Sequence, residues 1–212
     1  MKISVLCSNP DHPVFAHMGD WAARRSADHS LELVSRSSEL SGGDILFLIS
    51  CQEMIHKATR DRYKKTLVVH AGDLPRRRGW SPQIWTVLDG ENTIVVTLLE
   101  AEDAVDSGAI WKKLPIDLDG HELYDEINRK LFQAETELMD FAVDNFGAVS
   151  PQEQNPEGAT YCRRRRPEDS RIDLDRPLRE QFNLLRVSDP LRYPAFFEVN
   201  SHIYEIILKR RE

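Results

Sequence analysis

A histidine and an aspartate follow two apolar stretches that the sequence pattern predicts to be strands. His70 comes directly after residues 66–69, and Asp106 ends a second such stretch farther along the chain. An imidazole titrates near neutral pH, and a carboxylate can fix its charge and tautomer. The pair therefore suits attack by an amine on an acyl carbon, in which the nitrogen loses a proton and the carbonyl oxygen is stabilised. A histidine in a polar turn and an ordinary Asp-Ser-Gly turn are the structural alternatives.

Two arginine-rich stretches could supply a positive pocket for such chemistry. The first, residues 76–78, lies in the loop after His70 and leads into Gly79 and Trp80, whose indole could stack on a ligand. The second, residues 163–166, admits three interpretations: a nucleic-acid patch, a solvated run of charges or a clamp for phosphate. Because guanidinium groups bind a diphosphate in bidentate fashion, the clamp is a serious candidate.

The alternation of strands and helices predicts the scaffold that positions these side chains. Strands are expected at residues 3–7, 31–34, 45–49, 67–69 and 93–99, and helices at 14–25 and 121–145. Residues 110–116 are expected to pair with the preceding strand as a hairpin. This order indicates an α/β fold with a Rossmann-like, mostly parallel sheet and helices on both faces. His70 and Asp106 would then meet at the carboxyl edge of the sheet, where open sheets of this class bind ligands.

The composition changes at Gly147, and we place a boundary there. Residues 1–146 are predicted to form the catalytic core, and residues 147–212 a small α+β extension with a substrate-contacting loop. Within the extension, residues 177–187 have helical spacing, and residues 196–199 and 203–208 are expected to form a terminal β-hairpin. An exposed hairpin edge invites pairing, which makes it a candidate homodimer interface.

Charge and cysteine usage narrow the classes of function. A formal net charge of −7 argues against a general nucleic-acid-binding protein, which needs a basic footprint. Cys7, Cys51 and Cys162 form no C-x-x-C pair, so we expect no metal site, no disulfide framework and a reducing cytoplasm. We see neither a signal peptide nor a membrane-spanning apolar run, and we therefore expect no membrane association. The histidines other than His70 have no matching partners and are interpreted as incidental.

Three motifs in the core resemble those of the formyltransferase family that uses formyl-tetrahydrofolate. Residues 69–75 are V-H-A-G-D-L-P, residues 78–82 are R-G-W-S-P, and residues 105–110 are V-D-S-G-A-I. The family carries N-x-H-x-S-L-L-P, R-G-x-x-P and L-D-T-G-D-I at matching spacing. This resemblance covers roughly residues 43–143.

A second resemblance covers the extension. The motifs are R-R-R-P-E-D-S-R-I-D at residues 164–173, N-L-L-R at 183–186 and Y-P-A-F at 193–196. They resemble family members that formylate amino sugars on nucleotides, above all the small enzymes of pseudaminic-acid-type glycan biosynthesis.

The resemblance implies a role for each candidate residue. It makes His70 the acid–base residue near the transferred formyl carbon, and Asp106 the residue that orients it. The loops at residues 50–54 and 102–106 would hold the pterin of 10-formyltetrahydrofolate, the co-substrate. The folate-binding candidates are Cys51, Gln52, Met54, Glu102, Asp103 and Val105. The candidates for binding a UDP- or dTDP-linked sugar are Arg78, Gly79, Trp80, Arg164, Arg165, Asn183 and Arg186.

One departure from the family pattern concerns catalysis. The asparagine that the family carries two residues before its histidine falls on Val68, which has no hydrogen-bond donor for an oxyanion. Loss of one such donor typically slows a reaction by roughly a hundredfold to a thousandfold. Either another donor such as protonated His70 takes the task, or the substrate needs less help, or the protein is a binding relic. We favour the first, because His70, Asp106 and the two surrounding motifs are intact.

The sequence thus predicts a cytoplasmic N-formyltransferase. It would move a formyl group from 10-formyltetrahydrofolate to the amine of a nucleotide-linked amino-deoxy sugar. One alternative is a catalytically impaired sugar-nucleotide-binding module, motivated by Val68. Another is methionyl-tRNA formyltransferase, disfavoured by the acidic charge and by a tail too short for a separate tRNA-binding barrel. A plain nucleotide-binding protein is disfavoured because the chain has neither G-x-G-x-x-G nor a P-loop.

Overall fold

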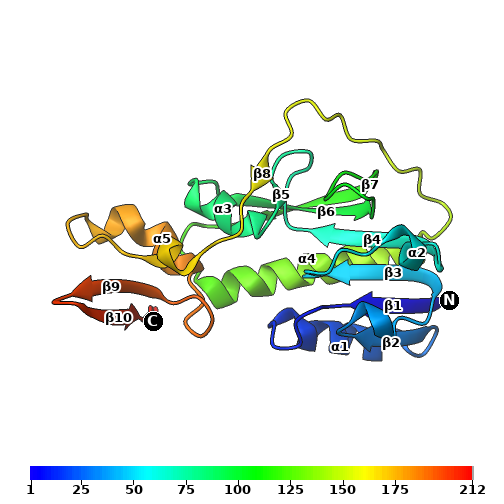
Figure 1. The fold of residues 1–212 in the computed structure, drawn as a ribbon, viewed down its shortest axis with the longest axis horizontal. Helices are drawn as coiled ribbons and strands as arrows, with labels where there is room; N and C mark the ends of the chain where they lie inside the picture. Colours follow the sequence, from blue (N-terminus) through cyan, green and yellow to red (C-terminus); the bar gives the residue numbers. More distant parts are fainter. Residues whose placement is uncertain (212) are drawn as a thin grey trace.

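The centre of the fold is a six-stranded sheet with the strand order β2-β1-β3-β4-β6-β7 (Figure 1). The computed structural model describes residues 1–211. The sheet strands are β1 (Lys2–Leu6), β2 (Ser30–Val34), β3 (Gly43–Ile49), β4 (Tyr63–His70), β6 (Thr93–Glu100) and β7 (Ile110–Asp117). Strands β2, β1, β3 and β4 pair in parallel, whereas β6 is antiparallel to β4, and β7 to β6. The predicted mostly parallel sheet with a hairpin-like edge is confirmed.

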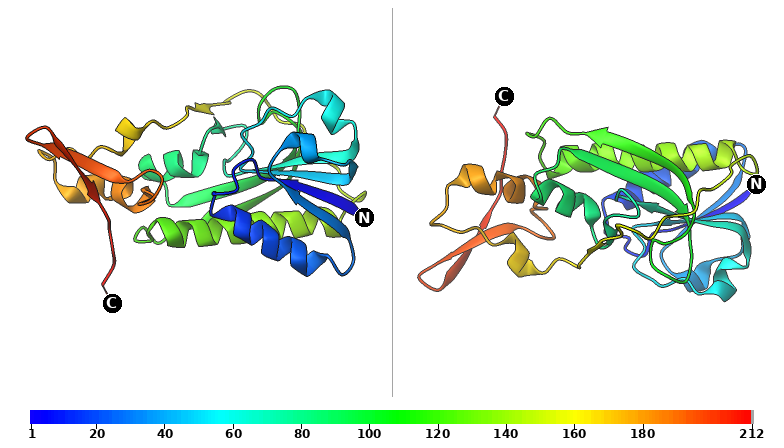
Figure 2. Two further views of the ribbon diagram at one scale, coloured as in Figure 1. Left: turned by 60° about the horizontal axis from the view of Figure 1, so that its bottom comes forward. Right: turned by 90° about the horizontal axis from the view of Figure 1, so that it is seen from above.

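Two long helices cover one face of this sheet (Figure 2). They are α1 (Val14–Arg25) and α4 (Tyr124–Asp144). Within residues 1–211, the helical elements on the opposite face are the short helix α2 (Lys57–Arg60) and the 3₁₀ turn η1 (Ser37–Glu39). The second face has no long helix because the connections from β2 to β3 and from β3 to β4 are short.

Burial on both faces explains the continuous apolar runs of the central strands. Ile3 and Phe47 belong to the core beneath α1 and α4, whereas Leu6 and Leu46 belong to the core under the loops of the other face. Strands covered on both faces lose polar alternation, as the sequence of β3 shows. Trp21 of α1 packs edge-on against Phe47, with ring centroids 5.8 Å apart. The carboxyl ends of these strands are therefore held by a packed core on each side.

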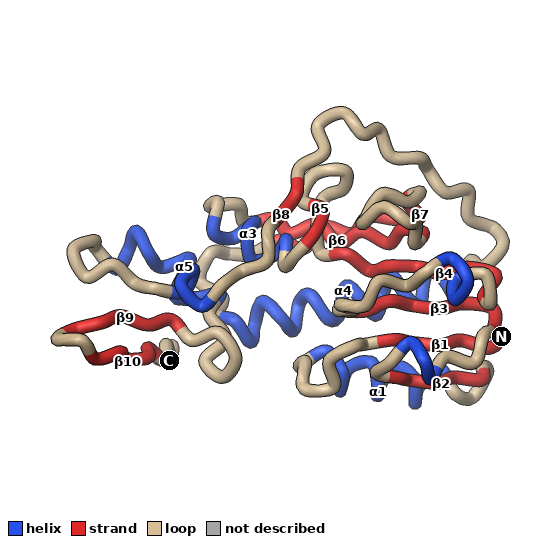
Figure 3. The backbone as a smooth tube through the Cα atoms, in the orientation of Figure 1, coloured by secondary structure: helices blue, strands red, loops and turns tan. Residues whose placement is uncertain are grey.

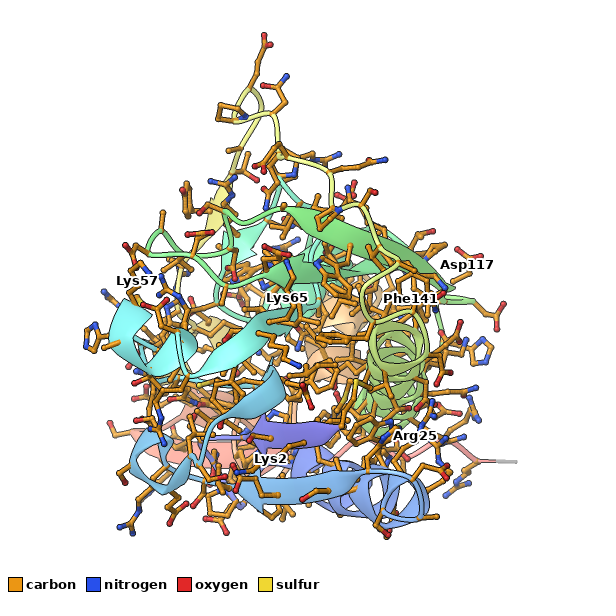
Figure 4. The ribbon with its side chains drawn as sticks, turned by 90° about the vertical axis from the view of Figure 1, so that its right-hand side faces the viewer. Lys2, Arg25, Lys57, Lys65, Asp117 and Phe141 are labelled. Carbon is orange, nitrogen blue, oxygen red and sulfur yellow. The ribbon has the colours of Figure 1, made fainter. Side chains whose placement is uncertain are left out.

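Ion pairs join the carboxyl ends of the two long helices. Arg25, in the last turn of α1, lies 2.8 Å from Asp140 and 2.9 Å from Asp144 of α4. Trp21 donates from Nε1 to Asp140 at 2.7 Å. Figure 4 shows Arg25 beside α4, at the end of the molecule where the parallel strands begin. The helices are thus fastened far from the carboxyl edge of the sheet.

The chain after α4 returns to the carboxyl edge of the sheet (Figure 3). An extended segment leads to β8 (Tyr161–Cys162), which pairs in parallel with β5 (Arg78–Gly79) in the loop that follows His70. Then η2 (Pro167–Ser170), η3 (Leu178–Gln181) and α5 (Phe182–Val187) follow, with α5 against α3 (Pro82–Leu88) and α4. Strands β9 (Ala195–Val199) and β10 (His202–Ile206) form the predicted terminal hairpin. The boundary at residue 146 stays a prediction, and the β5–β8 pairing ties the extension to the core.

Candidate active site

His70 ends β4, and both of its ring nitrogens face acceptors. Its Nε2 lies 2.8 Å from the main-chain carbonyl oxygen of Arg77. Its Nδ1 lies 3.5 Å from Oδ2 of Asp106. A carbonyl oxygen only accepts, so Nε2 carries the proton of the first contact. The contact between Nδ1 and the Asp106 carboxylate is longer than a normal hydrogen bond.

Asp106 is fixed by a left-handed turn and by hydrogen bonds from two other segments. Its φ is 52°. The main-chain N–H of Gly79 donates to Oδ2 at 2.8 Å, and Nε2 of Gln154 donates to the Asp106 carbonyl oxygen at 2.9 Å. Gly79 itself has a φ of 93°, and a Cβ there would lie 2.6 Å from the carbonyl oxygen of Cys162. The close β5–β8 pairing therefore requires glycine and places the donor that holds the carboxylate.

A cleft of about 790 Å³ opens beside His70 and Asp106. Leu48, Val68 and the loops after β3 and β6 form one part of its wall. The loop after β1, the inner face of α4 and the segment at residues 187–193 form another. The histidine and the aspartate therefore share one cavity with residues from both faces of the sheet and from the extension.

Five of the six predicted folate-binding residues line this cleft. They are Cys51, Gln52, Met54, Glu102 and Val105. Burial raises the pKa of the Cys51 thiol to about 11, so it stays neutral at physiological pH. Asp103 does not line the cleft, because its carboxylate pairs with Arg60 at 2.6 Å on the outer side of the loop. That ion pair joins α2 to the loop after β6.

Four of the seven predicted substrate-binding residues line the same cleft. They are Gly79, Trp80, Arg164 and Arg165. The guanidinium of Arg164 lies over the ring of Trp80, 4.8 Å from its centroid. Arg165 is half-buried and donates to Ser170 Oγ at 3.0 Å, and burial lowers its pKa. Arg163 instead pairs with Asp169 at 2.6 Å and lies outside the cleft.

Arg78, Asn183 and Arg186 lie outside the cleft and bind other protein groups. Arg78 is buried and donates to Gln154 Oε1 at 2.7 Å, which steadies the side chain that holds Asp106. Arg186 is 1% exposed, donates to Asn183 Oδ1 at 2.9 Å and lies 3.7 Å from Glu122. These contacts position the Asp106 loop and fasten α5 to the segment before α4.

Val68 lies two residues before His70, on the same face of β4. It is half-buried, lines the cleft and packs against the apolar cluster that contains Leu48. The position thus faces the reaction space and presents only methyl groups. A donor for a developing oxyanion has to come from another residue.

The cleft also contains polar residues that were not predicted from the sequence. Among them are His12, Tyr124, Asn128, Glu135, Asp189 and Arg192. His12, interpreted from the sequence as incidental, packs edge-on against Phe132 with ring centroids 6.1 Å apart and lines the cleft. Glu135 had a detectable signal, because it is an acidic residue on the otherwise apolar stripe of α4. Asp189 and Arg192 reach the cleft only because the extension folds back, which their local pattern does not indicate.

Two kinds of feature are absent from residues 1–211. No group of three or more histidine, cysteine, aspartate or glutamate side chains could hold a metal ion. No helix in this part of the chain combines the length and apolar character needed to cross a membrane.

Comparison with known proteins identifies the family of this chain. The family model described as formyl transferase matches residues 6–143. The chain belongs to the formyl transferase family. A methionyl-tRNA formyltransferase of Rickettsia felis is 25% identical over 182 residues, which are 85% of this chain and 58% of that protein. The chain spans about half the length of the curated relatives it matches.

Solved structures share the fold of this chain. Methionyl-tRNA formyltransferase from Clostridium thermocellum matches with a TM-score of 0.82 and 21% identity, covering 97% of this chain and 91% of that chain. A sugar N-formyltransferase from Shewanella matches with a TM-score of 0.73 and 14% identity, covering 100% and 98%. HypX from Aquifex aeolicus in complex with tetrahydrofolic acid matches with a TM-score of 0.74 and 21% identity, covering 96% and 36%. The predicted formyltransferase fold is confirmed.

Proposed function

We propose that this formyl transferase moves a formyl group from 10-formyltetrahydrofolate to the primary amine of a nucleotide-linked amino-deoxy sugar. The observation that carries the proposal is one cleft in which His70 and Asp106 lie together with Trp80 and Arg164. The acid–base pair therefore shares a cavity with an indole and a guanidinium group, which suit the nucleobase and the phosphates of a nucleotide. The similarity of the whole chain to a sugar N-formyltransferase supports this assignment.

The loops after β3 and β6 fit the pterin of the formyl donor. Leu48 and Val68 form an apolar wall, and residues 50–55, 100–102, 105 and 106 line the cleft around it. Ligand sites typically combine such apolar walls with a few placed polar groups. The match to a fold crystallised with tetrahydrofolic acid supports the same assignment. When bound, the donor supplies an activated formyl carbon.

His70 and Asp106 handle the proton of the transfer. The acceptor nitrogen forms a bond to the formyl carbon, the bond from that carbon to the donor nitrogen breaks, and the acceptor's proton passes to the nitrogen that leaves. Nδ1 of His70 is the nitrogen that can exchange this proton, because its 3.5 Å contact with Asp106 is longer than a normal hydrogen bond. Nε2 is held by the carbonyl group of Arg77 at 2.8 Å and keeps the ring in place.

Protonated His70 is also our candidate for the missing oxyanion donor. Both ring nitrogens face acceptors, so a ring that has taken up the transferred proton has an N–H on each side. A cationic donor beside the formyl carbon stabilises negative charge that develops on the carbonyl oxygen. It can thus take the task of the asparagine that Val68 replaces.

Trp80, Arg164 and Arg165 are suited to the nucleotide part of the acceptor. The exposed indole of Trp80 offers a flat surface for a base or for the guanidinium that already lies over it. Arg164 and Arg165 are adjacent in the sequence, and both line the cleft. Their forked guanidinium groups match the oxygens of a diphosphate. A pseudaminic-acid-type sugar stays a prediction from the resemblance of the extension.

Methionyl-tRNA is the second candidate acceptor, because the curated relatives are methionyl-tRNA formyltransferases. The net charge of −7 disfavours it, since tRNA binding requires neutralisation of many phosphates. A sugar-nucleotide-binding module without turnover is the third candidate, and Val68 is the observation that favours it.

A parallel formyl-transfer assay separates the three candidates. Wild-type protein is given 10-formyltetrahydrofolate with a UDP-linked 4-amino sugar, a dTDP-linked 4-amino sugar or methionyl-tRNA, and each product is examined by mass spectrometry. We expect one formyl group to be added to a sugar nucleotide, and His70→Ala to abolish the addition. Formylation of methionyl-tRNA alone would contradict the proposal. So would tight calorimetric binding of a sugar nucleotide without turnover.

A further inference from the structure

Glu135 is a buried carboxyl group in the cleft that the transfer chemistry does not use. It lies in the middle of α4, lines the cleft and is 5% exposed. Its Oε2 has no hydrogen-bond partner within residues 1–211. A buried polar atom without a partner destabilises a fold, and such atoms in native proteins are uncommon. The position of Glu135 therefore calls for a bound group that completes its hydrogen bonds.

The side chains around Glu135 on α4 are apolar. Leu131 and Leu138 lie one turn on either side, and Phe132 lies on the same face of the helix. Burial raises the pKa of Glu135 to about 8, so the carboxyl group is protonated at neutral pH. In this form it offers one O–H donor and one accepting oxygen to the cleft.

His12 contributes a second uncharged polar group to the same part of the cleft. The main-chain N–H of Val14 donates to its Nδ1 at 3.2 Å, which leaves the ring proton on Nε2. Burial lowers the pKa of His12 to about 4, with the charge of Arg192 adding to the effect. Its ring packs against Phe132, one turn from Glu135. The wall thus carries uncharged donors and an uncharged acceptor.

Two charged groups of this wall are paired with each other. Arg192 bonds the carboxylate of Asp189, and both residues line the cleft. Free guanidinium charge is located instead at Arg164, beside Trp80. Phosphate is therefore better accommodated at Arg164, and an uncharged polar group at Glu135.

We infer that Glu135 forms the floor of an acceptor subsite for an uncharged, hydrogen-bonding ring substituent, either a hydroxyl or an acylamino group. This inference rests on the proposed function and extends it to the part of the sugar that does not react. An acylamino group has a carbonyl acceptor and an N–H donor, which complement the donor of His12 and the carboxyl group of Glu135. Glu135 is then a specificity-determining residue.

Two substitutions at Glu135 test the subsite. Glu135→Gln keeps a neutral group with a donor and an acceptor, and Glu135→Leu keeps the volume but removes both. Steady-state kinetics are measured with UDP-2-acetamido-4-amino-2,4,6-trideoxyglucose and dTDP-4-amino-4,6-dideoxyglucose. We expect Glu135→Leu to raise KM for the preferred acceptor by about tenfold, with kcat and the donor KM changed much less. Glu135→Gln is expected to stay within about threefold of wild type.

Thermal unfolding separates a binding role from a structural one. An unpartnered carboxyl group in an apolar wall destabilises the fold, so Glu135→Leu should raise Tm. A Glu135 that served only to hold the fold would lower Tm when replaced. Glu137→Leu is the matched control, because Glu137 is exposed on the same helix and does not line the cleft.

The outcomes distinguish the two proposals. If wild type formylates either sugar and Glu135→Leu leaves its KM unchanged, the subsite is overturned and the proposed function stands. If wild type neither binds nor formylates either sugar, the proposed function fails and the subsite fails with it. A rise of KM in Glu135→Leu together with an unchanged or higher Tm supports the subsite.

Discussion

Oδ2 of Asp106 lies 3.5 Å from Nδ1 of His70 and also accepts a hydrogen bond of 2.8 Å from the main-chain N–H of Gly79. The histidine is held on its other side by the carbonyl group of Arg77. Arg77 and Gly79 therefore fix the acid–base pair through their main-chain groups. The geometry of the pair therefore depends on the β5–β8 pairing, and β8 belongs to the extension.

Replacement of His70 is expected to abolish transfer and leave the fold intact. In His70→Ala, loss of proton handling and of the cationic donor should lower kcat by roughly a thousandfold or more. Formyl transfer is measured with saturating donor, and circular dichroism reports folding. His121→Ala is the matched control, because His121 is exposed and outside the cleft. Full activity in His70→Ala would refute the assigned role.

Restoring an asparagine at Val68 tests how the missing donor is compensated. If His70 already stabilises the oxyanion, Val68→Asn should change kcat by no more than about threefold, because the added donor duplicates an existing one. If the oxyanion lacks a donor, the same substitution should raise kcat by about a hundredfold or more. Single-turnover rates of both proteins decide between these outcomes. Leu191→Asn, at an exposed residue outside the cleft, controls for a general effect of added polarity.

The sheet and the position of His70 could be predicted because their signals are local. Buried strands have continuous apolar runs, and the ends of parallel strands meet at one edge whatever the rest of the chain does. His70 follows from these two rules. Asp106 does not, because β6 is antiparallel to β4 and the loop after β6 has to fold back to bring Asp106 to His70. A short helix at residues 57–63 is predicted, and α2 (Lys57–Arg60) lies there. The sequence pattern does not show which face of the sheet each helix covers, because that depends on how the connections cross the sheet.

The substrate side was harder to predict because it depends on how the extension packs. Asn183 and Arg186 match a sugar-nucleotide motif, yet they bind each other and Glu122 behind the cleft. An arginine that binds a ligand and an arginine in a buried ion pair have the same sequence signature. Asp189 and Arg192 line the cleft only through the return of the chain to the sheet edge, which is a tertiary contact.

Arg164 is expected to bind the acceptor and not the formyl donor. Arg164→Ala should raise the acceptor KM by roughly tenfold at low salt, with a smaller effect at high salt because the charge is exposed. The donor KM should be unchanged. Arg166→Ala is the matched control, since Arg166 is an exposed neighbour in the same run and does not line the cleft. Equal effects of the two substitutions would mean that the run acts only as general charge.

The buried carboxylate of Glu122 should make the junction of α4 and α5 sensitive to acid. Burial opposes ionisation of Glu122, but hydrogen bonds from Lys130 and the Asp119 N–H outweigh it and lower its pKa to about 2. Because its pKa is lowered, ionised Glu122 stabilises the fold at pH values above 4.5, and this stabilisation is lost as the pH falls from 4.5 toward 2.

Glu122→Gln is therefore expected to lower the free energy of unfolding by roughly 3 kcal/mol at pH 7. The difference from wild type should shrink at pH 3. Urea unfolding at both pH values measures it, with Glu137→Gln as an exposed control. A difference that is the same at the two pH values would contradict the role of the carboxylate charge.

Glu135 should give the opposite dependence on pH. Burial raises its pKa from 4.5 to about 8, so between these values the folded state holds a proton that the unfolded state has released. The folded state is then progressively disfavoured as pH rises, by up to about 1.4 kcal/mol per pH unit. The pKa of His12 is lowered, so His12 makes the fold more stable as pH rises toward its ordinary value of 6.5. Wild type and Glu135→Gln both contain His12, so this contribution cancels when the two proteins are compared. The stability advantage of Glu135→Gln should grow from pH 5 to pH 8 in urea unfolding, and an advantage that stays constant would show that the carboxyl group is not held protonated.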